Sequence, residues 1–188
     1  MRAFVSVDLD GLTEEVAAVQ AELESVSGLN LVDPAGAHVT LKFLGEVEEA
    51  ERDLLDEELA AAVEASGVGP FDAEFGGLGV FPHPGYISVV WVGVREGRGD
   101  AELTALHEAV EERTTALGFD PEEHAFTPHV TLGRMEHAGG KERVQELLET
   151  WDPTVGTLDV TEVRLTESTP THEGPEYSTA ARFPLRTV

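Results

Sequence analysis

The residues most suited to chemistry lie in a repeated tetrapeptide, His-Val-Thr-Leu, which starts at His38 and again at His129. The second copy begins 91 residues after the first (129 minus 38). Both copies are rich in strand-forming residues, and in a strand residues i and i+2 point to the same face. Each copy is therefore expected to present an imidazole and a hydroxyl side by side, with Val and Leu packed behind them.

An imidazole beside a hydroxyl, present twice, suits the cleavage of a phosphodiester. A neutral histidine accepts the proton of the attacking water, and a protonated histidine donates a proton to the departing oxygen. Two hydroxyls can donate hydrogen bonds to the phosphate oxygens on which negative charge develops. We therefore predict that His38 and His129 are catalytic and that Thr40 and Thr131 bind the phosphate. The scheme needs neither a metal nor a cofactor.

Two cations next to the copies are further candidates for substrate binding. Lys42 continues the alternation of His38 and Thr40 and is expected on the same face. Arg134 falls on the opposite face of a regular strand, but Gly133 can mark a bulge that turns it inward.

The remaining aromatic and histidine side chains give weaker signals. Three rings could stack on a base, although we expect most of them to be core: Phe43, Phe126 and Tyr177. Five histidines follow no ligand spacing and are expected to be surface or structural: His83, His107, His124, His137 and His172.

The elements that must position the two copies alternate along the chain. Strands are expected at 3–9, 38–44, 71–81, 86–94, 129–135, 157–168 and 176–185, and helices at 14–26, 48–66, 100–117 and 140–151. The order of elements repeats coarsely after about ninety residues. It predicts an α+β fold with two pseudo-symmetric lobes of mainly antiparallel sheet, helices packed outside and a central cleft. The whole chain, residues 1–188, is expected to form one domain of two intertwined lobes.

Composition limits the class of protein. The chain has 37 acidic and 12 basic residues, a formal net charge of −25, and only two lysines, Lys42 and Lys141. Acids spread over the whole chain indicate a protein adapted to a salt-rich cytoplasm, such as that of a halophilic archaeon. The absence of cysteine excludes disulfides and thiolate metal sites. No long apolar run or signal segment is seen, so we expect a cytoplasmic protein without a membrane partner. A monomer is the default expectation.

With the motifs in place, the chain resembles the 2H phosphoesterases, which are defined by two His-x-Thr/Ser motifs. More narrowly, it is similar to the RNA 2′,3′-cyclic phosphodiesterases, also called 2′-5′ RNA ligase-like proteins. The matching segments include "MRAFVSVDL", "HVTLKFLGEV", "GVFPHPGYISVVWVGV" and "FTPHVTLGR". The resemblance implies hydrolysis of a 2′,3′-cyclic phosphate at an RNA end to a 2′-phosphomonoester. It also implies that His38 protonates the leaving 3′ oxygen and that His129 activates water.

Other functions remain open on the sequence. The same site could join tRNA halves through a 2′-5′ linkage or hydrolyse a small cyclic nucleotide. A non-catalytic RNA-binding module is disfavoured, because binding alone does not require two titrating histidines. Zinc binding is disfavoured because no third strong ligand accompanies His38 and His129.

Overall fold

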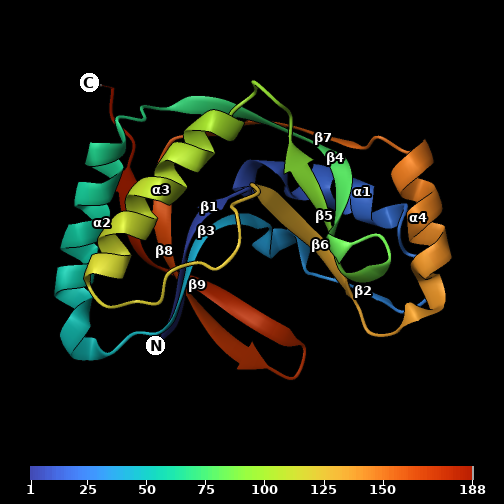
Figure 1. Cartoon of the computed structure of the whole chain (residues 1–188), viewed down its shortest axis with the longest axis horizontal. Helices are drawn as coiled ribbons and strands as arrows, with labels where there is room; N and C mark the ends of the chain where they lie inside the picture. The colour runs from blue at the N-terminus through green and yellow to red at the C-terminus, as the bar shows by residue number, and fades with distance from the viewer. Residues whose placement is uncertain (188) are drawn as a thin grey trace.

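The computed structural model describes residues 1–187 and contains four α-helices and nine strands within that range (Figure 1). The helices are α1 (Thr13–Ala21), α2 (Arg52–Ser66), α3 (Asp100–Ala116) and α4 (Lys141–Thr150). The strands are β1 (Arg2–Asp8), β2 (Leu29–Leu31), β3 (His38–Glu46), β4 (Phe71–His83), β5 (Tyr86–Val94), β6 (His129–Met135), β7 (Thr154–Val160), β8 (Glu162–Thr171) and β9 (Gly174–Pro184). Both HVTL copies begin a strand, as the sequence predicts.

The strands form one antiparallel sheet in the order β7-β4-β5-β6-β3-β1-β8-β9, with β2 paired to β6. Its two halves meet at a single pair of residues, Val39 of β3 and Val130 of β6. These valines are the second residues of the two HVTL copies. The junction of the two half-sheets is therefore also the place where the two motifs meet.

Each half-sheet is covered by helices on its outer face. Helices α2 and α3 pack together over the half that contains β3 and β9, whereas α1 and α4 lie at the other end of the molecule, against β7 and β4 (Figure 1). Two of these helices are exchanged between the halves of the chain. Helix α1, from the first half, supports the sheet of β6, and α3, from the second half, supports β3.

The buried apolar residues lie between the helices and the sheet. In β3 and β6, Val39, Leu41, Val130 and Leu132 are all buried, which matches the alternation expected of the two copies. No helix in residues 1–187 is both long and apolar enough to cross a membrane.

Two details of the strand prediction were wrong. The segment 157–168 was expected to be one strand, but β7 ends at Val160 and β8 begins at Glu162. These two strands lie on opposite halves of the sheet, so the chain crosses from one half-sheet to the other at Thr161. The short strand β2 was not predicted, because three residues are too few to show a clear alternation.

Candidate active site

The two histidines are held by the same backbone contact. His38 Nδ1 donates to the carbonyl of Gly36 at 2.8 Å, and His129 Nδ1 donates to the carbonyl of Thr127 at 2.7 Å. In both cases the acceptor lies two residues before the histidine. A proton on Nδ1 leaves Nε2 of each neutral ring as the atom able to take up a proton.

Each histidine shares its face of the sheet with the threonine two residues later. His38 Nε2 and Thr40 Oγ1 lie 3.0 Å apart, and His129 and Thr131 alternate with the buried Val130 and Leu132. We call this surface the motif face: the side of β3 and β6 that carries His38, Thr40, His129 and Thr131. Within the described residues, no hydrogen-bond partner is found for His129 Nε2, so this atom is free to meet a substrate.

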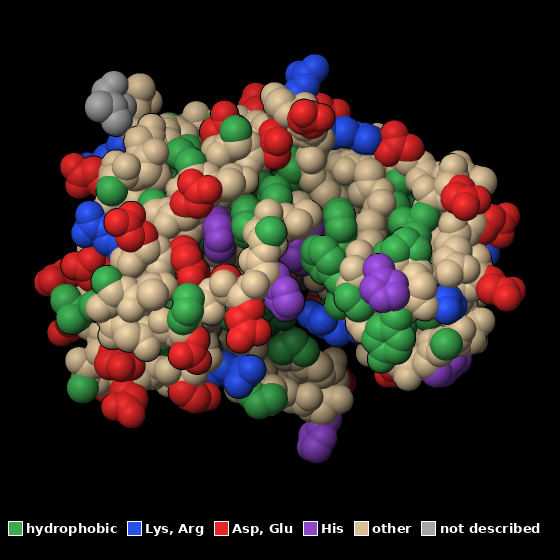
Figure 2. All heavy atoms as spheres, in the orientation of Figure 1, with side chains coloured by type: hydrophobic (Ala, Val, Ile, Leu, Met, Phe, Trp, Pro, Cys, Tyr) green, Lys and Arg blue, Asp and Glu red, His purple; other side chains and the backbone are tan. Residues whose placement is uncertain are grey.

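The pairing of Val39 with Val130 places the motifs diagonally across two neighbouring strands. Diagonal neighbours in an antiparallel pair lie roughly 7–8 Å apart. In this arrangement the positive charge of His38 lowers the pKa of His129. Figure 2 shows histidine side chains around a hollow in the middle of one face, with acidic side chains spread over the surrounding surface.

A bulge follows the threonine in each motif strand. In β3 the pairing with β1 skips Leu41, and in β6 the pairing with β5 skips Leu132. The extra residue reverses the faces of the residues that follow. Phe43 and Arg134, which occupy equivalent positions in the two strands, are consequently exposed on the motif face. Arg134 was expected there only if Gly133 marked a bulge, and a bulge is present.

The same bulge corrects the prediction for Lys42. Its side chain is only 1% exposed and lies on the core side of β3, where Nζ donates to Glu111 Oε2 at 2.7 Å and to the carbonyl of Asp120. The regular alternation that was assumed beyond Thr40 ends at Leu41, so Lys42 does not share the motif face. Lys42 links β3 to α3 and to the loop before β6.

Arg134 is a cation without a carboxylate partner in the part of the chain that the structure describes. Ion pairs in residues 1–187 involve Lys42, Arg52, Arg95, Arg98, Arg113, Arg143, Arg164 and Arg182. Arg134 has no such partner among these residues, although the chain carries a threefold excess of acids. Its positive charge lowers the pKa of both His38 and His129, and it shares the motif face with both rings. An unpaired guanidinium beside two imidazoles is suited to binding an anion.

Aromatic rings surround both histidines. The ring of His38 stacks on Phe4, with centroids 4.6 Å apart, and meets the edge of Tyr177 at 5.3 Å. The ring of His129 contacts Phe81 and Trp91 at 4.8 and 5.6 Å. These contacts restrict the orientation of each imidazole and keep part of its surface away from water.

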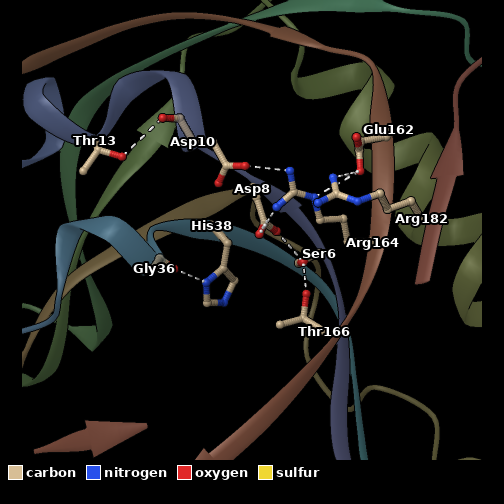
Figure 3. A network of polar contacts seen from close by, with 10 residues as sticks. All are labelled: Ser6, Asp8, Asp10, Thr13, Gly36, His38, Glu162, Arg164, Thr166 and Arg182. Atoms are coloured by element: carbon tan, nitrogen blue, oxygen red, sulfur yellow. Dashed lines mark hydrogen bonds and ion pairs between the residues drawn. The ribbon is translucent and has the colours of Figure 1, made fainter. Parts of the chain in front are cut away.

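An acidic network lies beside His38. Asp8 of β1 is the Cα partner of His38 and accepts hydrogen bonds from Ser6 Oγ at 2.7 Å and from Arg164 Nη1 at 2.8 Å (Figure 3). The negative charge of Asp8 raises the pKa of His38. Sequence reasoning missed this residue. The signal available was the alternation of Phe4, Ser6 and Asp8 in a strand next to the first motif.

Burial has the largest effect on both histidines and lowers the pKa of each below its ordinary value of 6.5. For His38 the Gly36 carbonyl and Asp8 oppose this effect, whereas Arg134 adds to it. For His129 the Thr127 carbonyl opposes it, and the charges of His38 and Arg134 add to it. A carboxylate, Asp8, therefore acts on His38 alone, whereas the charge of the other histidine acts to lower the pKa of His129.

A second hollow, of about 390 Å³, is lined by residues of β1, β7 and β8 and does not include His38. Its walls include Asp8, Asp10, Asp159 and Glu162 against one cation, Arg164. Four carboxylates repel a phosphate, so the motif face is the better anion site. In residues 1–187 no group of three or more His, Asp or Glu side chains is arranged to hold a metal ion.

The fold and the paired motifs define a two-histidine phosphoesterase, and comparison with known proteins agrees. Residues 10–170 match the model of the 2′-5′ RNA ligase superfamily, and the chain belongs to that family. An RNA 2′,3′-cyclic phosphodiesterase of Archaeoglobus fulgidus is 37% identical over 179 residues, which cover 94% of this chain and 96% of that protein. One from Methanothermobacter thermautotrophicus is 35% identical over 188 residues, covering 98% and 99% of the two chains.

Solved structures share the fold over nearly the whole chain. The crystal structure of TT0787 from Thermus thermophilus has a TM-score of 0.79 at 25% identity and covers 99% of this chain and 98% of its own. The structure of E. coli LigT complexed with 3′-AMP has a TM-score of 0.76 at 24% identity and covers 98% and 97%. The α+β fold with a curled antiparallel sheet is thus common to these proteins.

Proposed function

We propose that this protein hydrolyses the 2′,3′-cyclic phosphate at RNA ends and leaves a 2′-phosphomonoester and a free 3′-hydroxyl. The observation that carries the proposal is the pairing of Val39 with Val130, which brings both His-x-Thr motifs and the unpaired Arg134 to one surface. The names of the curated relatives support the same reaction.

In the proposed reaction a water oxygen attacks phosphorus while His129 Nε2 takes up the proton of the water. The bond between phosphorus and the 3′ oxygen breaks, and His38 Nε2 donates its proton to that oxygen. Asp8 favours a protonated His38, and the resulting charge favours a neutral His129. This electrostatic asymmetry supports the assignment of His38 as the acid and His129 as the base.

The phosphate is proposed to lie against the hydroxyls of Thr40 and Thr131 and the guanidinium of Arg134. These groups donate hydrogen bonds, and the bonds stabilise the transition state most when negative charge builds up on the non-bridging phosphate oxygens. The terminal base is proposed to stack on Phe43 and Tyr177. Their side chains are 63% and 41% exposed and both lie close to Phe4, next to His38. The scheme gives no task to a metal ion.

The test is incubation with an oligonucleotide that ends in a 2′,3′-cyclic phosphate, at high salt and with EDTA. A 2′-phosphate product is expected. His38→Ala and His129→Ala should each reduce kcat by about 10²–10⁴-fold, the usual contribution of a general acid or base. His172→Ala, an exposed histidine in the β8–β9 turn, is the matched control and should keep the wild-type rate.

Three results would contradict the proposal. A 3′-phosphate product would reverse the roles of the two ribose oxygens. A near-wild-type rate in either histidine variant would remove that residue from the mechanism. Activity that is lost in EDTA and restored by Zn²⁺ would show that a metal takes part.

A further inference from the structure

The backbone carbonyl of each bulge residue accepts a hydrogen bond from a buried polar side chain of a helix. In β3 the carbonyl of Leu41 accepts a hydrogen bond of 2.7 Å from Nδ1 of His107, on α3. One face of this imidazole is covered by Phe126, whose ring stacks on His107 with centroids 4.2 Å apart and planes 6° apart. His107 is buried and lies outside the motif face, so the proposed reaction does not use it.

The second motif strand has a matching contact. The carbonyl of Leu132, the bulge residue of β6, accepts a hydrogen bond of 3.0 Å from Nε2 of Gln20, on α1. The same amide donates to the carbonyl of Val32 at 2.8 Å, and the backbone amide of Val32 also donates to Leu132. Gln20 is buried as well, and buried polar side chains are few among the described residues.

The two contacts are related by the pseudo-symmetry of the fold. Leu41 and Leu132 are equivalent residues of the two HVTL copies, yet one is bound by a histidine and the other by a glutamine. Each donor comes from the helix of the opposite half of the chain. A buried carbonyl at a bulge needs hydrogen-bond donors from outside the regular pairing. His107 supplies one for Leu41, and Gln20 and the backbone amide of Val32 supply two for Leu132.

We propose that His107 and Gln20 are positioning residues that maintain the two bulges and thereby hold Phe43 and Arg134 on the motif face. Without the bulge, alternation would place Phe43 and Arg134 on the core side, as it would have placed Lys42 on the motif face. His107 therefore acts through Phe43, and Gln20 acts through Arg134. The kinetic test of this inference rests on the proposed function, because it measures hydrolysis of a 2′,3′-cyclic phosphate.

Matched substitutions isolate the donors. His107→Phe keeps a ring to stack on Phe126 but has no Nδ1 proton, and Gln20→Met keeps the length of the side chain without the amide. Each should lower kcat/KM for a 2′,3′-cyclic nucleotide by about 2- to 12-fold, the range that corresponds to one lost hydrogen bond. His107→Gln, which supplies the donor used in the other lobe, should restore most of the loss.

Double-mutant cycles separate positioning from general stabilisation. In an Arg134→Ala background, Gln20→Met should cause no further loss, and in a Phe43→Ala background, His107→Phe should cause none. The crossed pairs, Gln20→Met with Phe43→Ala and His107→Phe with Arg134→Ala, should be additive. Thr114→Val is the control for destabilisation of α3, because Thr114 is buried and its hydroxyl donates to carbonyls within that helix.

Additive losses in the matched pairs would overturn the inference, since two residues that merely stabilise the fold would act independently. Crystal structures of His107→Phe and Gln20→Met would show directly whether the bulges persist. If Phe43 and Arg134 stay on the motif face in these structures, the inference is overturned as well. If the wild-type protein fails to hydrolyse the cyclic phosphate, the proposed function is wrong, and these crystal structures still decide the inference.

Discussion

At the scale of single residues, the two histidines have the same backbone support but different electrostatic surroundings. Both rings donate through Nδ1 to a carbonyl two residues earlier, so both present Nε2 to a substrate. His38 has a carboxylate, Asp8, opposite it on the adjacent strand, whereas the residue opposite His129 on β5 is Gly93. A reaction that needs one acid and one base can use that difference, because it separates the protonation preferences of two otherwise equivalent groups.

Asp8→Asn tests this asymmetry through the pH dependence of kcat/KM. The charge of Asp8 raises the pKa of His38, so its removal lowers that pKa. A proton donor with a lower pKa loses its proton at lower pH, and the alkaline limb of the profile should therefore move toward acid. The rate on the alkaline side of the optimum should fall, while the acid limb, set by His129, should change less.

Asp10→Asn is the matched control for Asp8→Asn. Asp10 also binds Arg164, at 2.6 Å, but it is not paired with His38 across the sheet. Its removal should leave the alkaline limb in place. An unchanged limb in Asp8→Asn, or an equal movement in both variants, would count against Asp8 as the group that maintains the proton on His38.

At the scale of elements, the bulges decide which side chains reach the substrate. The alternation of His38, Val39, Thr40 and Leu41 could be predicted because short strands alternate strictly. The reversal after Leu41 could not, since nothing in "HVTLKFLG" marks the extra residue, and Lys42 was assigned to the wrong face. In the second copy Gly133 gave a signal, and Arg134 was placed correctly under that condition.

Longer-range features were harder to predict for the same reason. The donors His107 and Gln20 are helical residues far from the strands they support, and their partners are backbone atoms, which have no sequence signature. The break at Thr161 lies within a run that alternates apolar and polar residues. The run contains no Gly, Pro or Asn to mark a turn, so β7 and β8 look like one strand in the sequence. Local patterns predicted most elements and both motifs, whereas tertiary contacts set the contents of the motif face beyond the threonines.

The β8–β9 hairpin brings Tyr177 to the first motif, and this placement predicts base recognition. Phe43→Ala and Tyr177→Ala should each raise KM for adenosine 2′,3′-cyclic phosphate by about 5- to 150-fold, which corresponds to a stacking contribution of about 1–3 kcal/mol. Neither should change KM for glycerol 1,2-cyclic phosphate, which has the reacting ring and no base.

Tyr86→Ala is the control for these two variants, because Tyr86 is 67% exposed and lies at the turn between β4 and β5. It should not affect either substrate. An equal rise in KM for the base-free and the adenosine substrates in Phe43→Ala would mean that the ring shapes the phosphate site and does not bind the base.

At the scale of the whole molecule, the charge is unfavourable to an RNA substrate except at one place. A net charge of −25 produces a negative potential over most of the surface. Arg134 forms no ion pair within the described residues and is exposed on the motif face, where its charge acts on both histidines. The anion site therefore depends on one local cation, Arg134, within a negative field. Salt should screen both the repulsion between RNA and the acidic surface and the attraction between RNA and Arg134.

The same charge predicts how salt affects stability. Repulsion among exposed carboxylates extends over roughly 10 Å at 0.1 M salt and roughly 3 Å at 1 M. Raising KCl from about 0.1 M to about 1 M should therefore raise Tm, with about 2–4 °C for each kcal/mol gained in a chain of this size. Thermal unfolding followed by circular dichroism measures it. A Tm that is flat or falls over this range would refute adaptation to a salt-rich cytoplasm.

A variant on α2 separates charge screening from other effects of salt. Asp53, Glu57 and Glu64 are exposed on this helix, and none of them forms an ion pair within the described residues. Replacing all three with Gln should raise Tm at low KCl and reduce its increase toward molar KCl, because less repulsion remains to be screened. If salt instead acts by strengthening the burial of apolar surface, the variant and the wild type should show the same dependence on KCl.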